Sequence, residues 1–236
     1  EYMSAIAENI AAVRERMARA AERAGRDPGD IALCAATKMN DAAAVRQAIA
    51  AGVDCCGENR VQELTAKLGE NAYVGAPVHF IGHLQRTTVR PVVGKVDLIQ
   101  SVDRTELLEA LQAEARRQGV RQEILLEVNI GGEAAKSGFA PEKIPEIVED
   151  FGSYPDLFLR GLMAIPPISH FPGENLRFFS EMCNLFVDIS RKKEDNVSVV
   201  HLSMGMTDDF EDAIACGSTM IRVGTGIFGP RHYDQP

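Results

Sequence analysis

The chain has 236 residues, of which 45% are hydrophobic, so it can bury one sizeable core. Its net charge is −9 and its acidic residues are dispersed, which argues against binding to nucleic acid or to an anionic membrane surface. The five cysteines are odd in number and lack CxxC spacing, so we expect reduced thiols in a cytoplasmic protein. No apolar run reaches about 18 residues, and we expect no membrane-spanning segment.

The first predicted element is an amphipathic helix over residues 3–24. Ile6, Ile10 and Val13 lie on one stripe, and Gly25 is a typical C-terminal stop. Beyond it, short apolar runs alternate with helical segments. The apolar runs predict eight strands, over residues 31–38, 53–56, 78–82, 97–101, 123–130, 157–165, 197–203 and 219–229. The intervening segments predict helices over residues 41–51, 59–69, 84–93, 104–119, 141–152, 174–193 and 209–217.

This alternation predicts an α/β fold with a parallel sheet and right-handed crossovers. Eight strands favour a closed (β/α)8 TIM barrel, and no linker divides the chain, so we expect a single domain over residues 1–236 with an extra N-terminal helix. The alternative is an open doubly wound sheet. That fold usually places a glycine fingerprint directly after its first strand, where this chain has TKMND.

Lys38 stands where the first apolar run gives way to a polar turn. Period-two alternation places it on one face with Ala32, Cys34 and Ala36, whose small side chains leave room for a ligand. The amine can therefore serve a bound molecule. The alternative is that Lys38 is only the first solvated residue after a strand.

In a barrel, the carboxyl ends of the strands meet at one mouth, where binding and catalytic sites lie. The loops after the seventh and eighth strands suit a phosphate group, because Ser203 offers a hydroxyl and Gly205 and residues 224–226 leave the backbone accessible. A helix beginning near Thr207 would add its positive end. The alternative is that these glycines only form tight turns. The residues expected around the mouth are Lys38, Asn59, His83, Ser101, Asn129, Met163, Ser203 and Gly224.

Arg222 lies two residues before Gly224, so alternation turns both toward the barrel interior. A buried guanidinium needs hydrogen-bond acceptors. One candidate acceptor is Glu127, which alternation also turns inward. The other is a ligand, such as a pyridine nitrogen, which would stay unprotonated because a guanidinium has only donors.

A lysine, a phosphate cradle and an inward arginine together point to a phosphorylated aldehyde held as a Schiff base. This is the chemistry of pyridoxal 5′-phosphate (PLP). Burial of Lys38 among small apolar side chains would favour the neutral, nucleophilic amine.

Six sequence blocks occur in order: ATKMND, FIGHLQ, SVDR, LEVNIGGEAAKSGF, RGLMAIP and LSMGMTDDFEDAIACGSTMIRVGTGIFG. Together they resemble the pyridoxal phosphate homeostasis protein family, also called PLP-binding protein or proline synthetase co-transcribed homologue, over about residues 33–233. That family is similar to the N-terminal barrel of bacterial alanine racemases, which are fold-type III PLP proteins. The resemblance implies one PLP bound to this chain.

The resemblance also implies a role for individual residues. Lys38 resembles the Schiff-base lysine, Asn59 the residue near the ring hydroxyl, and Arg222 the arginine opposite the pyridine nitrogen. His83 is expected near the mouth, although it is also compatible with a structural barrel histidine. Glu127 departs from the glutamine common in the family, which affects how Arg222 is paired. The residues that resemble phosphate binders are Ser203, Met204, Gly224 and Thr225.

The resemblance implies a non-enzymatic protein that sequesters PLP and supports vitamin B6 and amino-acid homeostasis, with PLP-dependent client enzymes as partners. The alternative is a small PLP-dependent amino-acid racemase or Schiff-base lyase. Racemisation needs a second acid/base group opposite the lysine. Related racemases take it from a tyrosine of an additional β domain across a dimer, whereas we expect a monomer without that domain. The four tyrosines fall in peripheral or terminal segments, at Tyr2, Tyr73, Tyr154 and Tyr233.

Overall fold

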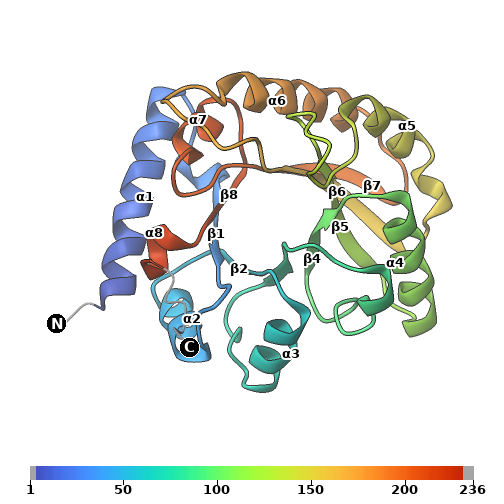
Figure 1. Ribbon diagram of the computed structural model, residues 1–236, viewed down its shortest axis with the longest axis horizontal. Coiled ribbons are helices and arrows are strands. Elements are labelled where there is room, and N and C mark those ends of the chain that lie inside the picture. Colours follow the sequence, from blue (N-terminus) through green and yellow to red (C-terminus); the bar gives the residue numbers. More distant parts are fainter. Residues whose placement is uncertain (1–3, 231–236) are drawn as a thin grey trace.

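Eight parallel strands close into a barrel in the computed structural model, which describes residues 4–230 (Figure 1). Each strand pairs with the next in sequence, and β8 pairs with β1. The predicted (β/α)8 barrel is confirmed, and the open doubly wound alternative is wrong because no sheet edge remains between β8 and β1. The strands are β1 (Ala32–Ala36), β2 (Cys55–Glu58), β3 (Val78–Phe80), β4 (Leu98–Val102), β5 (Gln122–Val128), β6 (Leu157–Ala164), β7 (Val197–Ser203) and β8 (Met220–Val223).

Helices surround the barrel on its outer side (Figure 1). Within the described residues, none of them is long and apolar enough to cross a membrane. The α-helices are α1 (Ala5–Arg23), α2 (Ala42–Ala50), α3 (Val61–Gly69), α4 (Thr105–Gln118), α5 (Ile144–Glu149), α6 (Leu176–Ser190), α7 (Phe210–Ala215) and α8 (Thr225–Phe228). The short 3-10 helices are η1 (Pro28–Asp30), η2 (Arg86–Thr88), η3 (Pro141–Lys143) and η4 (Phe151–Ser153).

Two predicted elements are wrong. The helix expected over residues 84–93 is only the three-residue η2, and Pro91, which lacks an N–H to donate, lies in the part that is not helical. The strand expected over residues 219–229 ends at Val223, where the chain turns into α8. Gly224 therefore begins a helical turn at the barrel mouth instead of continuing the sheet.

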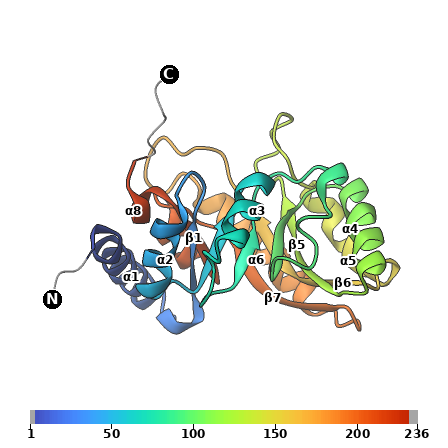
Figure 2. The ribbon, with the colours of Figure 1, turned by 90° about the horizontal axis from the view of Figure 1, so that it is seen from below.

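The N-terminal helix α1 covers the outside of the barrel next to α2, α7 and α8 (Figure 2). Its N-cap is Ser4, whose hydroxyl accepts a hydrogen bond from the Ala7 N–H. Arg16 joins it to α7, because the guanidinium pairs with Glu211 and lies 4.2 Å from the centre of the Phe210 ring. The buried stripe of this helix consists of Ile10, Val13, Met17, Ala20 and Ala21.

Strand side chains alternate between two environments. Those that point outward pack against the helices in the main hydrophobic core, which includes the fully buried Phe179 and Phe210. Those that point inward form smaller clusters inside the barrel. One inner cluster contains Cys34, Cys55 and Met220, and another contains Leu98, Leu125 and Met163. The outer core thus stabilises the barrel, while the inner face is free to carry polar groups.

Candidate functional site

The mouth of the barrel holds a cavity of about 260 Å³. Three loops form its walls: residues 165–169 after β6, residues 205–209 after β7, and Gly224–Thr225 after β8. Ala36, at the end of β1, closes one side. The cavity therefore lies where the barrel fold predicts a ligand site.

Lys38 lies two residues beyond β1 and is half-buried. It lines a small recess together with Asn40, Gly224 and Thr225. This recess shares Ala36, Gly224 and Thr225 with the larger cavity. The amine and the backbone of the β8 loop thus border one continuous region, even though 186 positions of sequence separate Lys38 from Gly224.

A buried network holds the backbone that carries Lys38. The Lys67 ammonium donates to the Glu58 carboxylate at 2.7 Å and to the carbonyl oxygen of Thr37 at 3.0 Å. The Thr37 hydroxyl also donates to Glu58, at 2.9 Å, and the Tyr73 hydroxyl does so at 3.0 Å. The next residue, Met39, has a left-handed φ of 63°, and its N–H donates to Glu63 at 2.8 Å. The turn at Lys38 is thereby fixed from beneath.

The loops after β7 and β8 come close together at the mouth. Thr207 accepts a hydrogen bond from the Gly226 N–H at 3.3 Å, and its hydroxyl lies 3.4 Å from that of Thr225. Gly205 has φ of 104°, and a Cβ there would lie 2.8 Å from the Cβ of Ala213, so glycine is needed for this turn. Accessible backbone of this kind suits an oxyanion.

Arg222 is 2% exposed and points into the barrel. Its guanidinium donates to the Ser203 hydroxyl at 2.5 Å and to the Ala164 carbonyl at 3.1 Å. The Ser203 hydroxyl in turn donates to the Gln100 side chain at 2.6 Å. Glu127 makes no ion pair with Arg222 within 4 Å in the described structure, so of the two candidate acceptors the carboxylate is not used. Burial raises the pKa of Glu127 to about 7.

The remaining expected site residues lie at different depths. The Asn59 N–H donates to the Glu58 side chain at 3.1 Å, and His83 is largely exposed, with its Nδ1 3.6 Å from Asp103. Met204 is buried, and its N–H donates to the Met220 carbonyl. Within the described chain, neither Asn59 nor His83 lines the two mouth cavities.

Two residues expected at the mouth lie below it. Ser101 is inside β4 and is 1% exposed, and Met163 belongs to an apolar cluster within the barrel. Both expectations are wrong because β4 continues to Val102 and β6 to Ala164, which leaves these side chains inside the sheet. Asn129 follows β5 as expected, and its amide donates to the Glu133 carbonyl within the next loop.

Sequence reasoning missed the polar residues that support the site. Gln100 links Ser203 to the barrel interior, and its signal was a polar side chain within the apolar run DLIQS. Lys67 belongs to the buried network, and its signal was a charge three residues after Leu64 on the apolar stripe of α3. Both residues place a polar group at a position where the spacing of apolar residues alone predicts a buried hydrophobic side chain.

Comparison with known proteins places the chain in a family. The pattern described as "Alanine racemase, N-terminal domain" matches residues 3–232. The chain is 43% identical to the pyridoxal phosphate homeostasis protein of Pseudomonas aeruginosa, over 99% of both chains, and 39% identical to that of Aquifex aeolicus, over 96% of this chain and 98% of the relative.

Solved structures agree with these relatives. The structure of PipY from Synechococcus elongatus with PLP bound has a TM-score of 0.80 and 32% identity, covering 95% of this chain and all of PipY. An alanine racemase from Streptomyces lavendulae, 17% identical with a TM-score of 0.73, shares the fold over 95% of this chain and 56% of its own. The chain therefore belongs to the alanine racemase N-terminal domain family and, within it, to the group named pyridoxal phosphate homeostasis protein.

Proposed function

We propose that this chain, as a single barrel domain, binds PLP at the mouth and holds it as a Schiff base on Lys38. Its role is the homeostasis of PLP and of amino acids in the cytoplasm, as a monomer. The observation that carries the proposal is the position of Lys38 beside a cavity bordered by Gly224 and Thr225. The names of relatives up to 43% identical, and the PLP in PipY, support it.

The residues at the mouth fit the cofactor in kind. PLP supplies a reactive aldehyde, a phosphate and a pyridine ring. The Lys38 amine suits the aldehyde, and the accessible backbone at Gly224 and Thr225 suits the phosphate. Arg222 can offer only donors to a ring nitrogen, which would keep that nitrogen unprotonated.

The other expected cofactor contacts support the Lys38 amine, the phosphate-binding backbone and the Arg222 guanidinium. Ser203 acts by accepting from Arg222 and so orienting the guanidinium, and Met204 forms the floor of the phosphate cradle. Asn59 faces the ring hydroxyl, and His83 stands at the rim. In this arrangement the cofactor is held by residues at the ends of five strands, β1, β2, β3, β7 and β8.

We propose that the protein is a carrier and not a racemase. A racemase needs a second acid/base group that faces the lysine across the substrate. Of the tyrosines in the described residues, Tyr73 is buried and donates to Glu58, while Tyr154 lines a pocket between α4 and α5. Burial raises the pKa of both phenols, so both stay protonated at neutral pH and neither supplies a phenolate base. Tyr2 and Tyr233 lie outside the described residues.

The proposed partners are PLP-dependent enzymes that lack their cofactor. A protein that holds PLP by a reversible covalent bond keeps the aldehyde from reacting with other amines and can release it to a client. The exposed Ile168 and Met206 stand beside the cavity and leave its entrance apolar on one side.

The test of the cofactor is spectroscopic. Purified protein incubated with PLP is expected to absorb visible light, and borohydride should fix one PLP onto Lys38. Lys38→Ala should abolish labelling while circular dichroism stays unchanged, whereas Lys136→Ala, which removes another lysine from a loop near the mouth, should leave labelling intact. Labelling that persists in Lys38→Ala would show that another lysine carries the cofactor.

A kinetic test separates the carrier from the enzyme. PLP-loaded protein is mixed with L-alanine and with other amino acids, and the D-enantiomer is measured. The carrier role predicts turnover far below about one per second, the lower end of ordinary enzymatic rates. Racemisation at or above that rate would refute it.

A further inference from the structure

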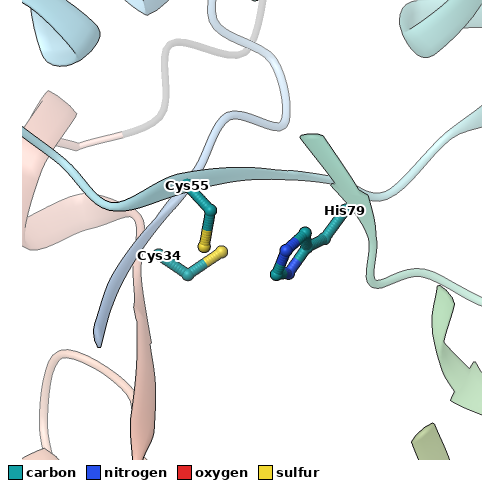
Figure 3. Close-up of side chains that lie close together, drawn as sticks. All are labelled: Cys34, Cys55 and His79. Atoms are coloured by element: carbon teal, nitrogen blue, oxygen red, sulfur yellow. The ribbon is translucent and has the colours of Figure 1, made fainter. Parts of the chain in front are cut away.

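Three metal-ligating side chains meet inside the barrel, below the mouth. Cys34 on β1, Cys55 on β2 and His79 on β3 all point inward, and Figure 3 shows the two thiols side by side with the imidazole ring directed toward them. One ligand atom from each lies within 4.8 Å of the others. All three residues are buried, with exposed fractions of 0%, 3% and 6%.

We propose that Cys34, Cys55 and His79 form a binding site for a thiophilic d10 cation, Zn²⁺ or Cu⁺. Two thiolates and one imidazole are ligands that both ions favour. A tetrahedral zinc site places two sulfurs roughly 3.8 Å apart and a sulfur and a nitrogen roughly 3.5 Å apart, as follows from the bond lengths. The donor atoms lie within 4.8 Å of one another, so they need to approach by at most about 1.3 Å to reach this arrangement.

The backbone explains why these side chains converge. Cys34 and Cys55 are directly opposite each other in the β1–β2 pairing, so their side chains leave the sheet at the same height. His79 is opposite Gly57, which has no side chain to separate it from the cysteines. A Cβ at Gly57 would lie 3.1 Å from the sulfur of Cys34 and 2.7 Å from Ile81. Glycine at this position thus gives the thiol its room.

A further sulfur lies next to the site, on β8. Met220 packs in the same inner cluster as the two cysteines, and its thioether is a soft donor. The Gln100 amide lies 2.9 Å from Nδ1 of His79 and 3.2 Å from Sδ of Met220, so it holds both side chains toward the cluster. Met220 is therefore the candidate for a fourth donor beside the two thiols and the imidazole.

Gln100 also provides the outer hydrogen bond that a metal-bound histidine requires. Coordination through Nε2 of His79 places the ring proton on Nδ1, which needs an acceptor. In the structure the Gln100 nitrogen faces Nδ1 of His79 and its oxygen accepts from the Ser203 hydroxyl at 2.6 Å. Turning the amide over by 180° would present its oxygen to Nδ1–H and its nitrogen to the Ser203 hydroxyl. The same amide thus satisfies both neighbours when the cation binds.

This site is separate from the proposed PLP site. It uses none of the residues that line the mouth cavities, although the Gln100–Ser203–Arg222 chain connects the two. Cys34 is opposite Arg222 in the β1–β8 pairing, so the two sites share one strand pair while using different residues.

The test is a metal titration of the full-length protein, kept reduced and refolded from urea because the donors are buried. Zn²⁺ and Cu⁺ are offered separately in competition with chromophoric chelators, and Cd²⁺ reports thiolate ligation by charge-transfer absorption. The proposal predicts one equivalent of Zn²⁺ or Cu⁺ per chain. Cys34→Ala and Cys55→Ala should each weaken binding at least about 100-fold.

Matched variants locate the site. Cys183→Ser and Cys216→Ser change two partly exposed cysteines outside the barrel interior and should bind as the unaltered protein does. Lys38→Ala should also bind normally, which keeps this test independent of PLP. Absence of binding to both ions, or binding that survives Cys34→Ala and Cys55→Ala, overturns the proposal.

A second measurement covers the case in which the alanine variants fail to fold. X-ray absorption by the metal-loaded, unaltered protein should show at least two sulfur ligands at about 2.3 Å. A shell of oxygen and nitrogen alone would overturn the proposal as well.

Discussion

Removal of the Lys67 ammonium should destabilise the turn that carries Lys38. In Lys67→Met, a side chain of similar length keeps the packing but leaves the Glu58 carboxylate, which is 0% exposed, without its cation. Breaking a buried ion pair by removing one partner costs about 3–5 kcal/mol. The carboxylate keeps hydrogen bonds from Thr37 and Tyr73, so we expect the free energy of unfolding to fall by about 3 kcal/mol, at the lower end of that range.

The assay is urea denaturation followed by circular dichroism, applied to a double-mutant cycle with Glu58→Gln. Lys67→Met leaves the Glu58 carboxylate without its cation, and Glu58→Gln leaves Lys67 only its longer pair with Glu63, at 3.5 Å. The double variant removes both buried charges of the pair. We expect a coupling free energy of at least about 2 kcal/mol between the two positions. Lys192→Met is the control, because its pair with Glu149 is exposed and should contribute less than about 1 kcal/mol.

Two results would refute this reasoning. A loss below about 1 kcal/mol in Lys67→Met would mean that the pair behaves like an exposed one. A coupling free energy near zero would mean that the loss comes from packing and not from charge. In either case, the network could not be the reason that Lys38 has a fixed position.

Three further variants test other parts of the site. Burial raises the pKa of Glu127 from 4.5 to about 7, so between these pH values the native state keeps a proton that the unfolded chain releases. The contribution of Glu127 to the free energy of unfolding is therefore fully present below pH 4.5 and is lost as the pH rises to about 7. Relative to Glu127→Gln, the unaltered protein should therefore lose up to about 3 kcal/mol of unfolding free energy between pH 4.5 and 8, and parallel pH profiles would contradict this. Gly205→Ala should cost at least about 1 kcal/mol in urea denaturation, because φ is 104° and the new Cβ meets Ala213; unchanged stability would show that the turn relaxes freely. Arg222→Ala should weaken PLP retention in gel filtration, and retention with an unaltered absorption spectrum would exclude a ring contact.

The strand order followed from the sequence because each strand carries its own local signal. Apolar runs such as EILLEV and LFLRGLMA are separated by helical segments of ordinary length, and parallel strands joined by helices have few possible arrangements. The failures occurred where local signals conflict. Residues 84–93 contain apolar positions at helical spacing, but Pro91 prevents a continuous helix, and at Gly224 the strand gives way to α8 although the apolar pattern continues.

The partners of individual side chains were much harder to predict from the sequence. Alternation correctly turned Arg222 inward, but the strand register decided its partners, and they are Ser203 and Ala164 instead of Glu127. A register is a relation between strands, so no single strand contains it. The same holds for Cys34 and Cys55, which look like ordinary core thiols in sequence and are brought opposite each other only by the β1–β2 pairing.

The sequence by itself determined the barrel, the position of Lys38 after the first strand and the glycines of the β8 loop. These depend on periodicity and on residue type, which are local properties. Only the tertiary structure decided that Lys38 and Gly224 border one region, and that Lys67 and Glu58 hold the turn beneath it. Closure of the barrel brings together residues that are far apart in the chain, and this closure fixes which polar groups find partners and which remain available for a ligand.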